Sequence, residues 1–412
     1  MTGTGGAAQV ARKVLVHVGA PKTGTSFVQD LLFTNREALA AQGILYPADR
    51  FDAHFLAALD LMELQWGGLE KQAVGAWDRL AEQVRDWDGD VIISHEILAT
   101  ASPEQVRRAL DSFGDAEVHV LLSARDLVRQ IPAEWQENVK HRRVVGYRAY
   151  LDKITDPSRR GALASWFWGV QEVPDILARW GSTLPPQRVH VVTVPRPGAP
   201  RGLLWERFAS VFGVDPAAYS ASTGRTNPSM GVPETALIRR INEQVNNGVL
   251  ANEDYRQFVR ELLAHRTLSS RSDSPRLALP PDVRAWAVDL SEAWIEELAT
   301  QGYDVVGSLD DLRPEPAAQD APFVDPDAPD ETAVADAAKD AIVVLLQEAA
   351  RLQGVERRLR EDLHAAEREL DRSRTWTFRV KRAVVHAGDT NRFVAGCLAV
   401  YRRLRGRSSR SA

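Results

Sequence analysis

An eight-residue segment near the N-terminus combines the residue types that bind anionic groups. Residues 19–26 read GAPKTGTS and follow the apolar run 14–18. Glycines allow a close backbone approach, Lys22 supplies a positive charge, and three hydroxyl groups can donate hydrogen bonds. The helical periodicity that begins at Ser26 would add backbone N–H groups and the positive end of a helix dipole. The segment therefore predicts a phosphate- or sulfate-binding loop between a strand and a helix.

The spacing of this loop differs from that of ATP-binding P-loops. Those loops read G-x-x-x-x-G-K-[ST], with the lysine directly after the second glycine. Here Gly24 is followed by Thr25, and the lysine precedes the glycine at position 22. The sequence also lacks a clear aspartate at the end of a strand, where such enzymes bind magnesium, and Asp126 is the nearest candidate. Both features weigh against a kinase or NTPase, which remains the alternative enzyme class.

The order of residues after the first strand resembles the 5′-phosphosulfate loop of sulfotransferases. These enzymes use 3′-phosphoadenosine 5′-phosphosulfate (PAPS) as the sulfuryl donor. The resemblance extends over roughly residues 12–300 and is most specific at 19–26. It implies that the 5′-phosphosulfate is held by Pro21, Lys22, Thr23, Gly24, Thr25 and Ser26. It also implies that Lys22 stabilises the leaving adenosine 3′,5′-bisphosphate as the bond to sulfur breaks.

The family's 3′-phosphate motif is matched in part. It consists of an arginine at the end of a central strand and a serine eight residues later. Arg125 follows the run 118–122 and matches the arginine, but Ala133 stands where the serine is expected. Arg225, in a basic Arg-Thr-Asn-Pro-Ser segment, resembles a region that closes on the nucleotide in relatives. An ordinary Asn-Pro turn explains the segment equally well. Residues that could replace the serine are Arg129, Gln130, Arg142 and Arg143.

Two adjacent residues are candidates for the catalytic base. His95 and Glu96 follow the run 91–93, and side chains at the carboxyl edge of a parallel sheet face the ligand crevice. Some sulfotransferases have a histidine at this position, and others use a glutamate. We favour His95, because an imidazole titrates near neutral pH. The alternative is a His–Glu pair that caps the helix from Pro103, with His54 as the reserve candidate for the base.

Other polar residues have structural interpretations. His17 lies within the first apolar run, which predicts a core position. Gln136, Glu137 and Lys140 follow Arg125 on a helical pattern and could meet an acceptor. A solvated helix face is the favoured interpretation of these three residue types.

The pattern of expected strands and helices around these residues predicts an α/β fold. Short apolar runs at 14–18, 91–93, 118–122 and 189–194 alternate with helical patterns, and such runs are typical of parallel strands buried on both faces. The helical patterns cover 26–35, 104–113, 131–140, 162–180 and 203–212. We expect a three-layer α/β/α core with a central parallel sheet, a P-loop-like phosphosulfate loop and a C-terminal helical extension.

Composition divides the 412 residues into four parts. Residues 12–303 predict the sulfotransferase-like α/β domain. Residues 304–340 hold five prolines and eleven acids against two bases, which predicts an acidic linker. Residues 341–371 carry a heptad pattern, and 372–412 form a basic amphipathic tail with eleven bases and one acid. The heptad 342–370 predicts either self-association in a coiled coil or a single helix folded on the core.

Composition also limits the protein's class. The net charge is 51 − 56 = −5, so nucleic-acid binding is not expected. One cysteine, Cys397, excludes a disulfide framework, and no histidine spacing indicates a metal site. No leader or membrane-spanning segment is recognisable, so we expect a cytoplasmic protein, with the basic tail offering peripheral contact with anionic membranes.

Together these features predict a sulfotransferase that moves a sulfuryl group from PAPS to a hydroxyl or amine. No metal is required by that chemistry. Glycan, lipid and small natural-product acceptors all fit the sequence. A non-catalytic nucleotide-binding scaffold is the alternative outside the enzymes.

Overall fold

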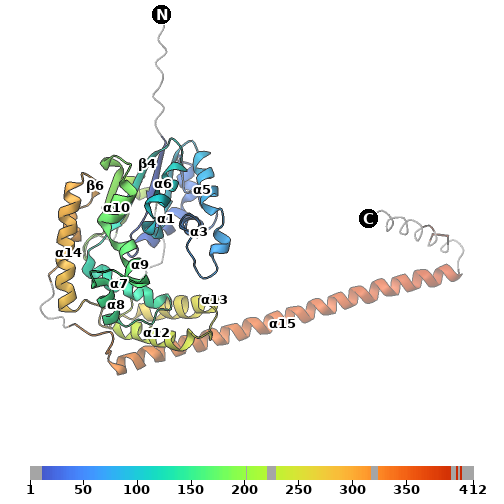
Figure 1. Cartoon of the computed structure of the whole chain (residues 1–412). Helices are drawn as coiled ribbons and strands as arrows, with labels where there is room; N and C mark the ends of the chain where they lie inside the picture. The colour runs from blue at the N-terminus through green and yellow to red at the C-terminus, as the bar shows by residue number, and fades with distance from the viewer. Residues whose placement is uncertain are drawn as a thin grey trace, which may run out of the picture. The chain divides into compact units, whose positions relative to one another are not determined.

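A computed structural model describes residues 12–200, 202–219, 229–316, 323–390, 396–397 and 400. By its internal contacts, the chain divides into a unit of residues 1–341 and a unit of residues 342–412. The first unit is built on one sheet and its flanking helices (Figure 1). No described helix is both long enough and apolar enough to cross a membrane.

The sheet has six strands, all parallel, in the order β2-β3-β1-β4-β5-β6. The strands are β1 (Lys13–His17), β2 (Ile44–Leu45), β3 (Asp90–Ser94), β4 (Glu117–Ala124), β5 (Val189–Thr193) and β6 (Asp304–Val306). β1 lies between β3 and β4, so the chain changes direction across the sheet at this strand. In such sheets a ligand crevice opens at this point, beyond the carboxyl ends of the strands.

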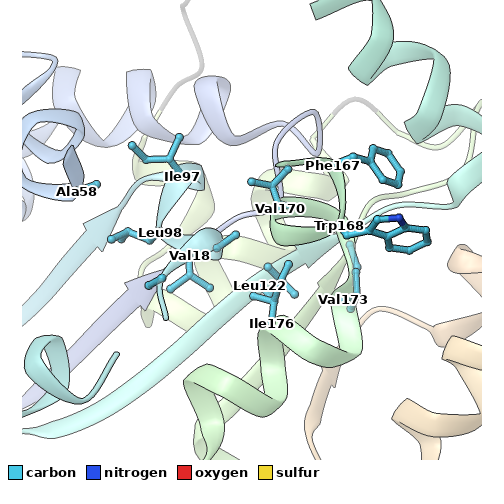
Figure 2. Packing of buried hydrophobic residues seen from close by; sticks show 14 of the residues in the cluster. Val18, Ala58, Ile97, Leu98, Leu122, Phe167, Trp168, Val170, Val173 and Ile176 are labelled. Carbon is cyan, nitrogen blue, oxygen red and sulfur yellow. The ribbon is translucent and has the colours of Figure 1, made fainter. Parts of the chain in front are cut away.

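Helices cover both faces of the sheet, which confirms the predicted α/β architecture. Leu15 and Ile92 pack with α1 (Thr25–Thr34) and α11 (Leu203–Phe212) in one apolar cluster, while Val14 and Val16 face a second, larger cluster. Figure 2 shows part of the larger cluster, with Val18 and Leu122 close to Ile176. The alternation of neighbouring residues between two cores explains why the strands read as continuous apolar runs.

Helices of the first unit overlap all five predicted helical patterns, and the other helices were not predicted. The helices of this unit are α1 (Thr25–Thr34), α2 (Arg36–Ala40), α3 (Ala53–Met62), α4 (Glu70–Ala73), α5 (Ala76–Arg85), α6 (Pro103–Asp111), α7 (Leu127–Lys140), α8 (Tyr147–Thr155), α9 (Ala162–Gln171), α10 (Val173–Gly181), α11 (Leu203–Phe212), α12 (Val232–Val245), α13 (Asn252–Asp254) and α14 (Pro281–Thr300). A π-helix spans Tyr255–Thr267, and the 3₁₀-helix η1 spans Glu96–Thr100.

The predicted helix over 162–180 is two helices. α9 ends at Gln171 and α10 begins at Val173, with Glu172 between them. Pro174 lies in the first turn of α10, where its missing N–H needs no partner. Further into a continuous helix the same proline would remove a backbone hydrogen bond, so the break falls just before it.

The expected linker over 304–340 is largely structured, and the prediction was wrong in this respect. Its first residues form β6, which pairs with β5, and η6 (Leu309–Leu312) follows. The acidic side chains have partners: His190 Nδ1 lies 2.7 Å from Asp304, and Arg207 donates to Asp311 at 2.8 Å. These partners come from distant parts of the chain, so local composition does not reveal them. Residues 317–322 lie outside the described residues.

The heptad segment is part of one long helix. α15 (Glu331–Thr390) begins inside the predicted linker, continues through Gly354 and passes residue 371 without a break. The expected boundary between heptad helix and basic tail is therefore absent from the backbone. Most of the tail beyond residue 390 lies outside the described residues.

Candidate functional site

The predicted anion-binding loop joins β1 to α1 at the carboxyl edge of the sheet. α1 begins after Gly24, which has φ 91° and offers no side-chain cap. The positive φ of Gly24 favours glycine, and a Cβ atom there would also lie 2.5 Å from Leu204 Cδ2, so the leucine side chain would have to move. The first-turn N–H groups of an uncapped helix have no intrahelical acceptor and can bind an anion.

The hydroxyl of Thr23 serves the loop itself. Thr23 Oγ1 is buried and lies 2.5 Å from both Ala20 O and Ser123 Oγ. Ser123 Oγ also donates to Gly19 O at 2.8 Å, which ties the loop to β4. Ser26, by contrast, is exposed at the start of α1. Of the predicted hydroxyl donors, Thr23 therefore fixes the loop, and its contribution to an anion site is limited to its backbone.

Arg125 lies beside this loop, as the sequence comparison predicted. It follows β4, the neighbour of β1, and its Nη1 donates to Lys22 O at 3.4 Å. Its Nε is buried and has no hydrogen-bond partner within the described residues. Burial, with the charge of Arg129, lowers the pKa of Arg125 to about 10. A buried guanidinium with an unused donor is suited to an anionic ligand.

The residues proposed to replace the missing serine differ in position. Ala133 is half-buried on α7. Gln130 Nε2 donates to Pro21 O and so contacts the loop. Arg129 instead pairs with Asp126, which accepts a hydrogen bond from the Arg129 N–H at the start of α7. Arg142 is directed elsewhere, toward Asn246, Asn252 and the ring of Tyr255.

Lys22 forms an ion pair that the sequence did not predict. Its Nζ lies 2.5 Å from Glu137 Oε2, on the last full turn of α7. Burial alone would raise the pKa of Glu137, but Lys22, followed by His141 and Lys140, outweighs it and holds the pKa well below its usual value. Glu137 is therefore a carboxylate at neutral pH, next to the lysine of the loop.

Three more basic groups surround the same carboxylate. Lys140 Nζ lies 3.8 Å from Oε2, while His141 Nε2 and Arg260 Nη2 lie 3.2 Å and 3.3 Å from Oε1. Lys140 is 3% exposed, which excludes the solvated helix face considered for Gln136, Glu137 and Lys140. Burial and the charge of Lys22 lower the pKa of Lys140 to about 8. We name Lys22, Glu137, Lys140, His141 and Arg260 the Glu137 cluster.

Glu134 is a second buried carboxyl group on α7, one turn before Glu137. Gln171 Nε2 donates to it at 3.3 Å. Burial raises the pKa of Glu134 to about 7, although the charge of Lys22 opposes the shift. Two carboxyl groups one turn apart thus have widely different affinities for a proton.

The two candidate bases follow β3 as predicted. His95 Nδ1 accepts a hydrogen bond from Ile97 N at 3.3 Å, so His95 caps η1. The helix from Pro103 is capped by Ser102 instead. The alternative interpretation, in which His95 and Glu96 cap that helix, is therefore wrong. Gln29 Nε2 donates to Glu96 at 2.8 Å. Burial would raise the pKa of Glu96, but His95 and Gln29 lower it overall.

The other two histidines have structural roles. His54 Nδ1 accepts from Ser94 N, and its Nε2 lies 3.2 Å from Pro47 O, so both ring nitrogens are in use. His17 is fully buried between Ser94 and Ser123. Burial lowers the pKa of each imidazole to about 4. The core position predicted for His17 is confirmed.

The structure therefore brings Lys22 and Arg125 together and places His95 and Glu96 at the same edge of the sheet. Arg225 lies outside the described residues. Sequence reasoning missed Glu134 and Arg260. Glu134 could have been found from its spacing of three residues from Glu137, but nothing in the sequence connects Arg260 to a helix 120 residues earlier.

Comparisons with known proteins add two distant structures. No family model matches the chain, and no curated protein matches its sequence. A sulfotransferase from Alicyclobacillus acidocaldarius is 18% identical, with a TM-score of 0.38, over 72% of this chain and 98% of that chain. The sulfotransferase domain from the curacin biosynthetic pathway is 10% identical, with a TM-score of 0.30, over 68% and 98% of the two chains. The site described above is derived from this chain's own residues.

Proposed function

We propose that this protein is a PAPS-dependent sulfotransferase. The observation that carries the proposal is the contact between Arg125 and the loop at Lys22. Two motifs that lie 103 residues apart in sequence meet at the carboxyl ends of adjacent strands. A loop with free helix N–H groups suits a 5′-phosphosulfate, and the unused Nε of Arg125 suits a 3′-phosphate.

The residues present fit the charge of such a donor. PAPS would bring a phosphosulfate and a 3′-phosphate to a site that already holds two cations, Lys22 and Arg125. In the reaction the acceptor oxygen forms a bond to sulfur, and the bond from sulfur to the 5′-phosphate oxygen breaks. The electron pair stays on the 5′-phosphate oxygen of the leaving adenosine 3′,5′-bisphosphate, where Lys22 would stabilise the negative charge. Positioning and electrostatics account for most of the rate in transfers of this kind.

The acceptor's proton must pass to a base, and the geometry favours Glu96 over His95. Because His95 Nδ1 accepts from Ile97 N, a neutral ring carries its hydrogen on Nε2. His95 could act as a base only after giving up that hydrogen bond. Glu96 is a carboxylate at neutral pH and needs no such change. Both residues stay candidates until they are replaced separately.

The proposal is tested by calorimetric titration of the full chain with adenosine 3′,5′-bisphosphate, the product that PAPS leaves. We expect micromolar binding that ATP with magnesium does not match. Lys22→Ala should weaken it about tenfold or more, as loss of a charge-assisted contact does. The matched control is Lys71→Ala, because Lys71 is exposed on α4.

Two results would overturn the proposal. One is the absence of bisphosphate binding by the folded protein. The other is a preference for magnesium-ATP, which would favour the kinase or NTPase alternative. Equal weakening in Lys22→Ala and Lys71→Ala would show that the loop lysine has no special role.

A further inference from the structure

The Glu137 cluster holds more positive than negative charge in a partly buried place, with Lys140 as its most buried member. Lys22, Lys140 and Arg260 contribute three positive charges, and Glu137 contributes one negative charge. Burial lowers the pKa of His141, which therefore adds no full charge at neutral pH. Buried charges are costly unless they are paired. Glu134 near Lys22 and Glu261 near Lys140 offset part of this excess. The remaining positive charge favours a site that is completed by an anion.

Lys140 is the most buried cation of the cluster, and its contact with Glu137 is a long one. Its side chain is 3% exposed, yet Glu137 Oε2 is 3.8 Å away, beyond hydrogen-bond distance. Glu137 Oε2 is already bound by Lys22 at 2.5 Å. A buried ammonium group has three hydrogens to donate, and this carboxylate oxygen cannot satisfy them.

Arg260 reaches the cluster from a different element. It lies on the π-helix Tyr255–Thr267, a rare conformation that is often found at functional sites. Its Nη2 donates to Glu137 Oε1, while its Nε is buried without a hydrogen-bond partner among the described residues. Arg260 thus has donors left for a planar or tetrahedral oxyanion.

The two oxygens of Glu137 divide the cluster into two sides. Lys22 contacts Oε2, whereas Arg260 and His141 contact Oε1. If the proposed function is correct, the donor's sulfonate takes the charge of Lys22. Lys140 and Arg260 would remain. Arg260 lies on the Oε1 side, away from the donor loop, and Lys140 lies 3.8 Å from Oε2.

We propose that the sulfuryl acceptor is itself anionic, and that Lys140 and Arg260 bind its negative group. The group is an oxyanion, such as a carboxylate, a phosphate or an existing sulfate ester. This inference rests on the proposed function, because it assigns Lys22 to the donor. It narrows the acceptor class from any hydroxyl compound to acidic ones.

The test uses the full chain saturated with adenosine 3′,5′-bisphosphate. Sodium sulfate is titrated at constant ionic strength against chloride, and the melting temperature is recorded. We expect a saturable stabilisation by sulfate. Lys140→Met and Arg260→Met should each weaken sulfate binding tenfold or more and leave bisphosphate affinity within twofold. Arg256→Met, on the exposed side of the π-helix, is the matched control and should change neither.

The outcomes separate this inference from the proposed function. Failure of the bisphosphate to bind refutes the donor assignment. Normal bisphosphate binding without saturable sulfate binding refutes the anionic acceptor alone. If Lys22→Ala abolishes the sulfate effect while Lys140→Met and Arg260→Met preserve it, the anion belongs to the donor's sulfonate position and the inference is wrong. Two methionine variants are used so that the test still has an answer if one of them fails to fold.

Discussion

His119 and His190 stack with their ring planes 14° apart, and Nδ1 of His119 lies 2.8 Å from Nε2 of His190. The outer nitrogens of the pair face carboxylates, with Glu117 at 2.9 Å and Asp304 at 2.7 Å. The row of contacts connects β4, β5 and β6.

We predict that Asp304→Ala weakens the attachment of β6. The variant loses a charge-assisted hydrogen bond, and because Asp304 is half-exposed the expected cost is about 1 kcal/mol. Urea unfolding followed by tryptophan fluorescence measures the change. Asp88→Ala, at an exposed residue outside the row, is the control and should unfold like the unaltered protein. Equal stability of both variants would contradict the role assigned to Asp304.

We also predict that the protein loses stability in mild acid. Burial lowers the pKa of His17 and His54 from 6.5 to about 4, so the folded protein keeps both rings neutral where the unfolded chain protonates them. Stability from these groups is complete above pH 6.5 and falls as the pH drops toward 4. The slope is at most about 1.4 kcal/mol per pH unit for each histidine.

Urea unfolding at several pH values between 7 and 5 measures this slope. His17→Gln should reduce it, because one of the proton uptakes is removed. A free energy of unfolding that stays constant over this range would show that the two rings are not neutral in the folded state.

The base is identified by separate replacements. We expect Glu96→Gln to lower kcat about a hundredfold or more, as loss of a general base does, with bisphosphate affinity unchanged. His95→Asn retains a polar cap for η1 and should have the smaller effect. The reverse order would restore His95 as the base. If neither variant changes acceptor turnover, the base lies elsewhere, and Glu134 is then the next candidate.

The exposed seam of α15 leads to a prediction about self-association. Large apolar residues recur at heptad spacing and are solvent-exposed in the single chain, namely Ile342, Leu345, Leu352, Leu359, Leu363, Leu370, Val380 and Val384. Exposed apolar seams of this length are typical of two-stranded coiled coils. We predict that a second copy of the chain covers this seam.

Light scattering after gel filtration tests this prediction. We expect about twice the chain mass of 45.6 kDa. The double variant Leu359→Asp, Leu363→Asp should be a monomer, because two charges enter the seam. Val343→Asp changes an equally exposed residue outside the seam and should remain a dimer. If the unaltered protein is a monomer, the self-association is refuted and the alternative of a single helix folded on the core is favoured.

The parts of the fold that the sequence predicts are those with a strong local signal. Strands β1, β3, β4 and β5 are buried on both faces, so their apolar runs are unambiguous. β2 has two residues and β6 has three within an acidic stretch, and neither shows such a run. β6 depends on its pairing with β5, which no local pattern records.

The candidate site shows the same division. Lys22 and Arg125 lie next to strand ends, so their positions follow from the strands. The local sequence pattern around Lys140 is that of a polar residue on an amphipathic helix. Its burial depends on the π-helix that carries Arg260, and this helix is distant in sequence. Burial of a charged residue is a property of tertiary structure, and single-sequence patterns therefore assign such residues to the surface.

The position of β6 has a consequence for how the protein is made. Chains are synthesised from the N-terminus, and domains tend to fold as they emerge. β6 is the last strand of the sheet and lies at its edge, so a nascent chain shorter than Val306 leaves the edge of β5 unpaired. Unpaired strand edges promote aggregation. Residues 304–306 thus cover the five-residue edge of β5 and leave the three-residue β6 as the shorter edge strand.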